Sequence, residues 1–131
     1  MSEKFELVKS YLFELELPIV HEDEAEELVV ITDEENGITN FIIDCEDPIL
    51  ILEQVIMDAP KEPGDLFKRL LQMNRELVHG AFVLDETAEK VIFRDTLQLE
   101  NLDRNELEGS ISALSLALAE FSTELLSYVA K

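Results

Sequence analysis

The sequence of 131 residues is poor in cysteine and in basic residues: it has one cysteine and ten lysines plus arginines, against thirty aspartates plus glutamates. The lone Cys45 excludes an intramolecular disulfide and cannot form a thiolate metal site by itself, as expected in a reducing compartment. The formal charge of −20 is the opposite of the basic surface that phosphate contacts require. Nucleic acid and anionic membranes are therefore not expected as partners.

Long hydrophobic runs are also missing. The first residues lack the basic segment followed by an apolar one that a secretory signal shows, and no apolar stretch reaches the roughly 18 residues of a membrane span. The hydrophobic fraction of 47% is ordinary for a folded domain, and the length suits one core rather than two. We therefore expect a single soluble domain over residues 1–131 with a cytoplasmic location.

The negative charge has two interpretations that stay open. Because the apolar residues are ordinary in number and follow regular periods, the carboxylates are expected to coat a folded body rather than to keep the chain disordered. They can serve solubility alone, or they can favour a basic partner.

Hydrophobic periodicity alternates along the chain between helical and strand-like spacing. The predicted elements are a helix over 2–17, a charged loop over 20–26, strands over 27–32, 38–45 and 49–57, a helix over 63–77, strands over 81–84 and 90–97, and a helix from 103 nearly to the C-terminus. This order, α-βββ-α-ββ-α, predicts an α+β fold in which three helices pack with a five-stranded, mostly antiparallel sheet.

Local signals support several of these boundaries. Ser2 is a suitable N-cap for the first helix, and Asp103 begins a sequence that resembles a capping box. Asn36-Gly37 tolerates the positive φ values of a tight connection between two strands. The run over 49–52 is apolar at every position, which predicts burial on both faces and a central place in the sheet.

The last predicted helix carries a regular apolar stripe. Its members recur at alternating steps of four and three residues: Leu107, Ile111, Leu114, Leu118, Phe121, Leu125 and Tyr128. This spacing is typical of a helix that packs along a sheet, and it also fits a seam shared with a second subunit.

No motif meets the requirements of a metal site. The acidic run that starts at His21 lacks the second histidine of a zinc-binding helix, because the residue four positions later is Ala25. Aligning Gly37 with the invariant glycine of a calcium loop puts Thr32 and Ile43 where carboxylate ligands belong. Both segments are therefore expected to be ordinary surface structure.

No motif meets the requirements of a catalytic site either. Cys45 is flanked by carboxylates that would raise its pKa, and His79 lies at a predicted helix end where a structural role is expected. A glycine-rich phosphate loop and a serine-centred elbow are both missing. The sequence predicts no enzyme, no cofactor, and no catalytic, cofactor-binding or metal-binding residue.

Asn74 is a polar residue on an apolar helical segment. Its expected role is to hydrogen-bond the backbone of a neighbouring loop or strand, while Gly80 provides the tight exit into the next strand.

These features carry a resemblance to a known family. The residues concerned are Leu70, Leu71 and Asn74, then Gly80 with Phe82, the strand from Val91 to Phe93 and the long terminal helix. With the order of elements over nearly the whole chain, they resemble the bacterial type III secretion chaperone-like fold, including the YbjN-type group of sensory transduction regulators. The resemblance implies a small acidic α+β protein, usually a homodimer, that holds a partner polypeptide and performs no reaction.

The sequence thus predicts a chaperone-like or adaptor-like module that binds a polypeptide. The resemblance implies a homodimer whose favoured contact is the second helix, through Leu66, Leu70 and Met73, with the seam on the last helix as the alternative. A regulatory or sensory domain that binds a small molecule between helix and sheet is the second candidate function. An unrecognised enzyme is the third.

Overall fold

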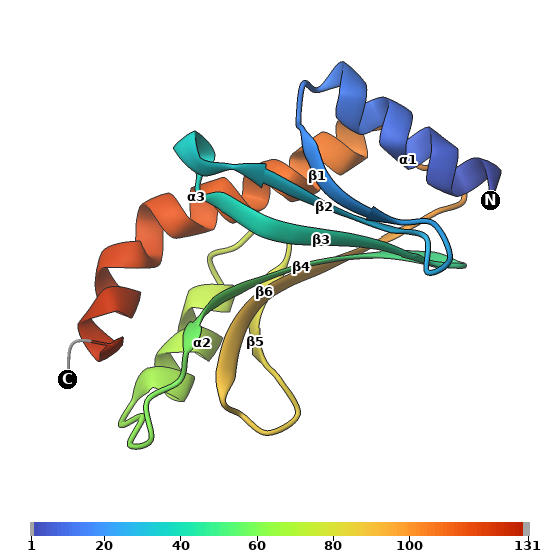
Figure 1. The fold of residues 1–131 in the computed structure, drawn as a ribbon. Coiled ribbons are helices and arrows are strands. Elements are labelled where there is room, and N and C mark those ends of the chain that lie inside the picture. The colour runs from blue at the N-terminus through green and yellow to red at the C-terminus, as the bar shows by residue number, and fades with distance from the viewer. Residues whose placement is uncertain (1, 130–131) are drawn as a thin grey trace.

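The computed structural model describes residues 2–129, in which three α-helices pack on one six-stranded sheet (Figure 1). The helices are α1 (Glu3–Glu14), α2 (Leu66–Asn74) and α3 (Arg104–Val129); the strands are β1 (Ile19–Asp23), β2 (Leu28–Asp33), β3 (Ile38–Glu46), β4 (Ile49–Asp58), β5 (Ala81–Leu84) and β6 (Lys90–Gln98); and a 3-10 turn, η1 (Glu34–Asn36), joins β2 to β3. The predicted α+β class is confirmed. Within residues 2–129, none of the helices combines the length and the hydrophobicity that a bilayer crossing needs.

The strands lie in the order β1-β2-β3-β4-β6-β5, and every neighbouring pair is antiparallel. The predicted central position of the segment over 49–57 is confirmed, because β4 pairs with β3 on one side and with β6 on the other. The prediction that the run over 49–52 is buried on both faces is wrong for one face. Leu50 and Leu52 are fully buried, whereas Ile49 and Ile51 on the opposite face are only half-buried.

All three helices pack on one face of the sheet, which we call the inner face. In Figure 1, α3 passes behind the strands and α2 lies toward the β5 edge. Apolar side chains of the strands that point to this face form a single core with the helices: Val29, Ile31, Phe41, Ile43, Cys45, Leu50, Leu52, Phe82, Val91 and Phe93. Burial of each large side chain contributes on the order of 2 kcal/mol, so this face provides most of the folding free energy.

The N-caps of helices α1 and α3 form as the sequence predicts. The Ser2 hydroxyl accepts a hydrogen bond from the backbone N–H of Phe5 at 3.1 Å, and the Asp103 carboxylate accepts one from the N–H of Glu106 at 2.7 Å. Tyr11 on α1 donates to the carbonyl of Leu102 at 3.3 Å, which ties α1 to the start of α3.

The chain between α1 and β2 differs from the prediction. The segment over 20–26, predicted as a charged loop, contains four of the five residues of β1, which pairs with β2 through His21↔Val30 and Asp23↔Leu28. The sheet therefore has six strands rather than five. The physical reason is that β1 is an edge strand with both faces partly exposed, so it shows no hydrophobic alternation that a sequence could reveal. Helix α1 also ends at Glu14, three residues before the predicted end.

The apolar stripe of α3 packs along the sheet, as one of the two interpretations of the sequence predicts. Six of its members are buried, and Leu118 is half-buried against Gly37: a Cβ atom at Gly37 would lie 3.1 Å from Leu118 Cδ1. Near its C-terminal end α3 is joined to α2 by a two-pronged ion pair, in which Arg69 donates to Glu124 at 2.6 and 2.8 Å.

Candidate binding surface on the outer face of the sheet

The opposite face of the sheet, which we call the outer face, is not covered by any of the three helices. Strand register aligns its side chains in two long rows. One row runs His21, Val30, Ile42, Glu53, Arg94 and Ala81; the next runs Asp23, Leu28, Asp44, Ile51 and Thr96. Each row mixes aliphatic and charged side chains, so this face differs from the uniformly apolar inner face.

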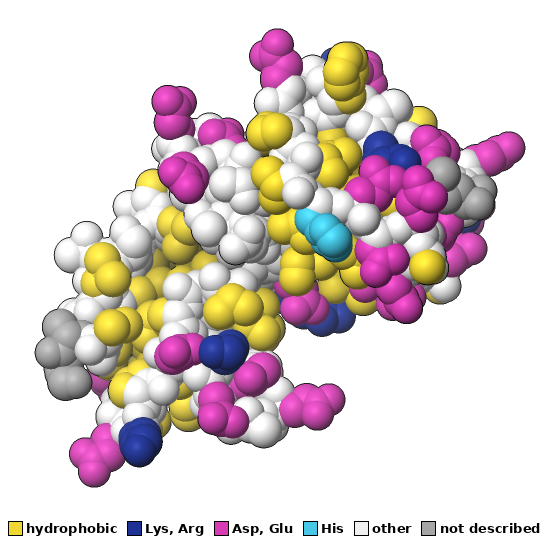
Figure 2. Space-filling view, viewed as in Figure 1, with side chains coloured by type: hydrophobic (Ala, Val, Ile, Leu, Met, Phe, Trp, Pro, Cys, Tyr) yellow, Lys and Arg dark blue, Asp and Glu magenta, His cyan; other side chains and the backbone are white. Residues whose placement is uncertain are grey.

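The aliphatic side chains of the outer face are partly open to solvent. Ile42 is 40% exposed and Val55 is 53% exposed, while Val30, Ile51 and Ile92 are half-buried. Figure 2, seen from the direction of Figure 1, shows hydrophobic side chains exposed beside carboxylates, which gather at the end of the molecule that carries the N-terminus. An open apolar surface with acidic neighbours is typical of a site that binds another macromolecule.

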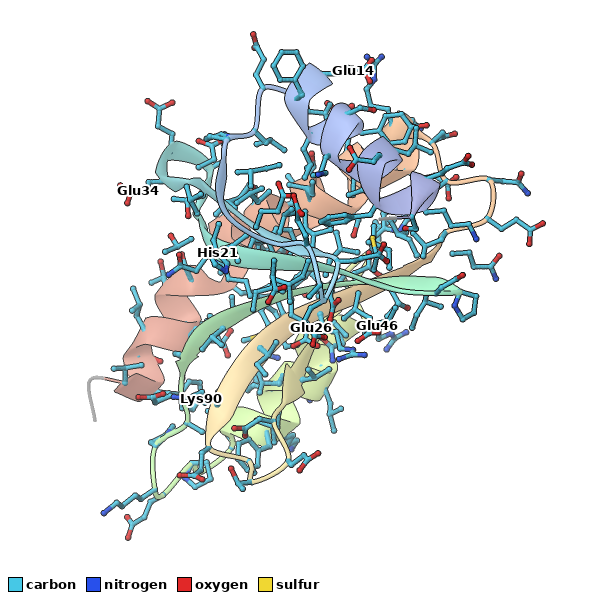
Figure 3. The ribbon with its side chains drawn as sticks, turned by 45° about the vertical axis from the view of Figure 1, so that its right-hand side comes forward. Glu14, His21, Glu26, Glu34, Glu46 and Lys90 are labelled. Carbon is cyan, nitrogen blue, oxygen red and sulfur yellow. The ribbon has the colours of Figure 1, made fainter. Side chains whose placement is uncertain are left out.

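Asp44, near the end of β3, is the most unusual residue of this face. Its Oδ1 atom is enclosed and has no hydrogen-bond partner among the described residues. Burial raises the pKa of the Asp44 carboxyl, the nearby carboxylates of Glu46, Glu26 and Glu53 raise it further, and a side-chain hydrogen bond with Glu46 also favours the protonated form. In Figure 3 the labelled side chains of Glu26 and Glu46 lie next to each other at this end of the sheet. An ionised carboxylate in this position lacks a compensating donor.

Cations of the outer face are already paired. The six strands contain two basic residues, Lys90 and Arg94. Lys90 Nζ lies 2.5 Å from Asp58 Oδ1, and Arg94 forms an ion pair with Glu53. Both cations bind other carboxylates, so a proton is what neutralises the Asp44 carboxyl beside Glu46.

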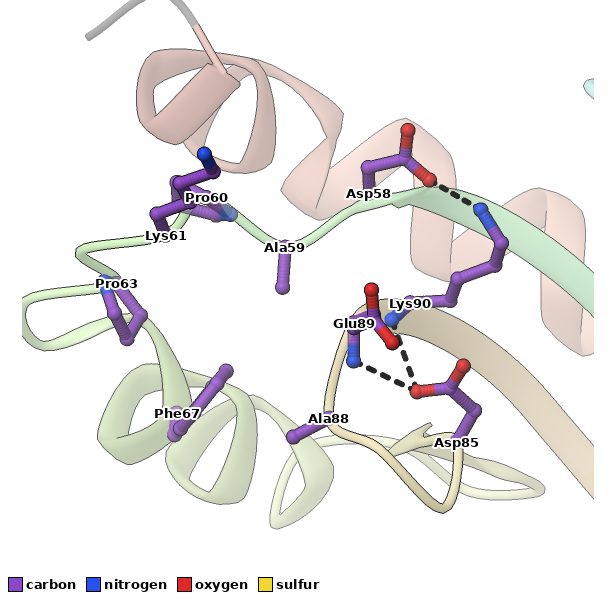
Figure 4. Close-up of a pocket in the computed structure, with 10 residues that line it drawn as sticks. All are labelled: Asp58, Ala59, Pro60, Lys61, Pro63, Phe67, Asp85, Ala88, Glu89 and Lys90. Atoms are coloured by element: carbon purple, nitrogen blue, oxygen red, sulfur yellow. Dashed lines mark hydrogen bonds and ion pairs between the residues drawn. The ribbon is translucent and has the colours of Figure 1, made fainter.

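A cavity of about 540 Å³ lies at the far end of the molecule, between the β4–α2 connection and the β5–β6 turn (Figure 4). Several of its polar groups are used within the chain: the Asp85 carboxylate accepts from the backbone N–H groups of Glu89 at 2.8 Å and Lys90 at 3.0 Å, and Lys90 is paired with Asp58. These bonds hold the turn closed, and they lower the pKa of Asp85. Three of the five charged side chains that line the cavity, those of Asp58, Asp85 and Lys90, are therefore already engaged within the chain, which weakens the case for a small-molecule site.

A second hollow, of about 690 Å³, is an apolar groove between the α2–β5 connection and the middle of α3. Leu77, Val78, Leu116 and Ala117 are among the residues that line it. Val78 is 89% exposed and Leu116 is 70% exposed, so the groove is open to solvent rather than enclosed. It suits a macromolecular contact better than a small ligand.

Leu66, Leu70 and Met73, which the resemblance implies for a dimer contact, lie in the core of the protomer. Their side chains are 0%, 3% and 0% exposed. The outward side of α2 carries Leu71, which is 73% exposed. A contact between α2 and a second chain stays a prediction, and Leu71 is the large apolar side chain that α2 presents for it.

The histidines and the cysteine, which the sequence does not support as catalytic residues, lie far apart in the structure. His21 lies on the outer face, His79 is exposed in the connection before β5, and Cys45 is buried on the inner face. Burial raises the pKa of the Cys45 thiol to about 12, with smaller contributions from Glu27 and other nearby carboxylates. Within residues 2–129 no group of three or more histidine, cysteine or carboxylate side chains is placed to hold a metal ion.

The sequence did not predict that the outer face of the sheet is an exposed binding surface. A signal for it was present, because Val30, Ile42 and Ile51 alternate with inner-face residues along three successive strands. The sequence could not show which of the two alternating sets the helices cover.

Comparison with known proteins gives a consistent result. The family model CesT_Tir_1 matches residues 1–131. Among proteins with curated functions, none matches the chain by sequence.

Solved structures share the fold at low sequence identity. YbjN from E. coli is 14% identical with a TM-score of 0.72, and the match covers 92% of each chain. A chain of the ExsC-ExsE complex is 22% identical with a TM-score of 0.67, covering 96% of this chain and 97% of that one. A chain of the HopA1-SchA chaperone-effector complex is 14% identical with a TM-score of 0.64, covering 87% and 89%.

Proposed function

The chain belongs to the CesT_Tir_1 family, and from this premise we propose that it is a non-catalytic module that holds a partner polypeptide. The observation that carries the proposal is the outer face, where an uncovered sheet exposes aliphatic side chains among carboxylates. Such a surface can bind a chain segment through apolar contacts and can attract a basic segment by charge.

The related folds support the proposal. Two of the similar structures are complexes, ExsC-ExsE and HopA1-SchA, and the second is described as chaperone and effector. Fold similarity alone is a weak guide to function, so the proposal depends on the surface of this chain as well. The same proposal includes a cytoplasmic location in a bacterium.

We also propose that the protein forms a homodimer. With a charge of −20, two copies repel each other wherever carboxylates dominate, so contact is favoured where the surface is uncharged. The exposed Leu116 lies on such a surface, within the uncharged stretch of α3 over 109–119, and the exposed Leu71 lies on α2 with the basic Lys68 and Arg75 as its neighbours on the helix.

A regulatory domain that binds a small molecule is the second candidate function. The groove beside α3 is the place for it, because its lining is mostly apolar. The exposure of Val78 and Leu116 makes this candidate weaker, since a small ligand there would keep much of its own surface in water.

The direct test is capture of a partner from the native host by the immobilised protein, elution with salt, and stopped-flow binding of the identified polypeptide. We expect association to slow as salt rises from about 10 to about 300 mM, because carboxylates steer the encounter of a basic client. Replacing acidic residues over 22–27 with glutamine should slow association more than it accelerates release. Retention of a small metabolite and no polypeptide would contradict the proposal and favour the regulatory candidate.

A further inference from the structure

We propose that the apolar groove beside α3 binds an amphipathic helix of the partner polypeptide, whose apolar stripe packs in the groove and whose flanking residues are lysine or arginine. This inference rests on the proposed function and adds a second kind of client segment, a helix, at a place other than the outer face of the sheet. The groove lies between the α2–β5 connection and the part of α3 over 109–120.

The groove exposes apolar side chains that the core leaves uncovered. Val78, in the α2–β5 connection, is 89% exposed, and Leu116, on α3, is 70% exposed. Leu116 also borders a second hollow, of about 400 Å³, which α3 forms with the end of α1 and the β2–β3 connection. Its side chain therefore stands as a ridge between two hollows. A partner that covers this ridge removes apolar surface from water on both sides.

Gly109 indicates that another helix approaches α3 closely. It lies inside a 26-residue helix, where glycine is less favourable than alanine. A Cβ atom at Gly109 would meet nothing within 4 Å, so packing among the described residues does not require a glycine there. Ala113 and Ala117 follow at steps of four residues, on the same side of α3. Side chains this small let a second helix pack at about 8 Å between the helix axes.

The backbone of the groove favours a helical occupant over an extended one. The residues of α3 use their backbone N–H and carbonyl groups within the helix, so a client segment that lies along α3 finds few backbone partners. A helix satisfies these groups internally. The part of α3 over 109–120 is about 17 Å long, which corresponds to about three turns of a client helix.

Charge complementarity defines the flanks of the client helix. Glu76 and Glu120 line the groove, and neither carboxylate has an ion pair or a hydrogen bond with another described residue. An adjoining hollow near the start of α3 adds Glu106 and Glu108. Apart from His79, no basic residue of the described chain lines either hollow. A helix with lysine or arginine beside its apolar stripe complements this surface, whereas a second copy, with a charge of −20, carries an excess of carboxylates.

A synthetic helix tests the inference without knowledge of the natural client. The probe is a labelled peptide of about 18 residues of leucine, alanine and lysine, with leucines at alternating steps of three and four and lysines beside them. One matched peptide has glutamate in place of lysine, and another keeps the lysines but has two central prolines that break the helix. Fluorescence anisotropy at about 150 mM salt, which screens long-range attraction, measures binding. We expect a Kd below about 100 μM for the lysine peptide and at least about tenfold weaker binding of both matched peptides.

Variants of Gly109 then locate the contact. Gly109→Leu should weaken binding of the lysine peptide about tenfold or more, because its side chain occupies the space of the client helix. Gly109→Ala should weaken it about twofold or more, yet raise the thermal midpoint by about 2 °C or more, because alanine favours the helix and the protomer has room for the Cβ atom. The control Ser10→Leu adds an apolar side chain at an exposed position of α1 and should change Kd less than about twofold.

Charge variants test the flanks of the client helix. The double variant Glu76→Gln/Glu120→Gln should weaken binding of the lysine peptide about threefold or more. The control Glu3→Gln/Glu86→Gln removes the same charge at exposed positions outside the groove and should change Kd less than about twofold. Equal effects of the two double variants would show that the peptide responds to net charge alone and would contradict the inference.

Other outcomes would also overturn the inference. They are equal binding of the lysine and proline peptides, or unchanged binding of the lysine peptide to Gly109→Leu. If the wild type is a dimer by light scattering and Gly109→Leu is a monomer, the occupant of the groove is a second copy rather than a client. If a polypeptide captured from the host binds normally to Gly109→Leu, the inference fails while the proposed function stands. Capture of no polypeptide contradicts the proposed function instead, and the peptide titrations, which use no host material, keep the two failures apart.

Discussion

The side-chain amide of Asn74 on α2 forms two hydrogen bonds with the backbone of Phe82 on β5. Its Oδ1 accepts from the Phe82 N–H at 2.7 Å, and its Nδ2 donates to the Phe82 carbonyl at 3.0 Å. Because β5 is an edge strand, no further strand is available to hydrogen-bond the outward N–H and carbonyl groups of Phe82. The Asn74 amide forms these two hydrogen bonds instead. Gly80, at φ 76°, makes the turn that brings β5 beside Asn74.

Asn74→Ala should lower the free energy of unfolding by about 1–3 kcal/mol, because it leaves a backbone donor and a backbone acceptor of Phe82 unsatisfied. Urea denaturation followed by circular dichroism measures the change. Lys68→Ala, on an exposed position of the same helix, is the control and should cost less than about 0.5 kcal/mol. An equal loss in the two variants would show that the amide is not structurally important.

Asp44→Asn should raise the thermal midpoint at pH 7. Burial and neighbouring carboxylates raise the pKa of Asp44 in the folded protein, so the folded state binds this proton more tightly than the unfolded state does. The wild type therefore loses stability as pH rises through the raised pKa, and the asparagine variant does not.

The advantage of Asp44→Asn should shrink on acidification and vanish below the unfolded carboxyl pKa of about 3.9. Differential scanning fluorimetry from about pH 3 to pH 8 measures it, with Glu86→Gln as the charge-matched control. A pH-independent difference, or one equal to that of the control, would contradict the pKa shift of Asp44.

Salt should stabilise the whole protein. The Debye length falls from about 30 Å at 10 mM to less than 10 Å at 300 mM, which screens repulsion among the carboxylates and raises the thermal midpoint. Calcium at micromolar concentration and chelators should have no effect beyond ionic strength. A midpoint that is flat with sodium chloride and rises with calcium would indicate a cation site instead.

Substitution of two exposed leucines should identify the dimer contact. Light scattering on a sizing column is expected to give the mass of two chains for the wild type. Leu71→Asp should give monomers if α2 forms the contact, and Leu116→Asp should do so if α3 forms it, because each places a charge in an apolar interface. A mass of one chain for the wild type up to about 100 μM would reject the homodimer.

Cys45 should resist thiol reagents in the folded protein. The side chain is 6% exposed, and burial raises its pKa to about 12, so almost no accessible thiolate exists at pH 8. Reaction with 5,5′-dithiobis(2-nitrobenzoic acid) should be slow in buffer and complete within minutes in guanidinium chloride. Rapid reaction of the native protein would contradict the buried position.

The family resemblance and the structure agree on the fold. They differ on whether the apolar residues of α2 are exposed for contact with a second chain. Leu66, Leu70 and Met73 have helical spacing that fits either a core or an interface, and their burial in the protomer depends on where α2 lies on the sheet. That position is fixed by contacts distant in sequence, such as Arg69 with Glu124. A spacing pattern contains no information about such contacts.

Sequence alone determined the types of the three helices and of the strands β2 to β6, the caps at Ser2 and Asp103 and the role of Asn74, because each depends on periodicity or on hydrogen bonds to nearby backbone. Tertiary structure decided the rest. It made the charged segment at 19–23 a strand, since pairing with β2 supplies backbone hydrogen bonds that its side chains do not predict. It also placed all three helices on one face, which leaves Ile42 exposed on the other. The two alternating sets of side chains are equivalent until a helix covers one of them.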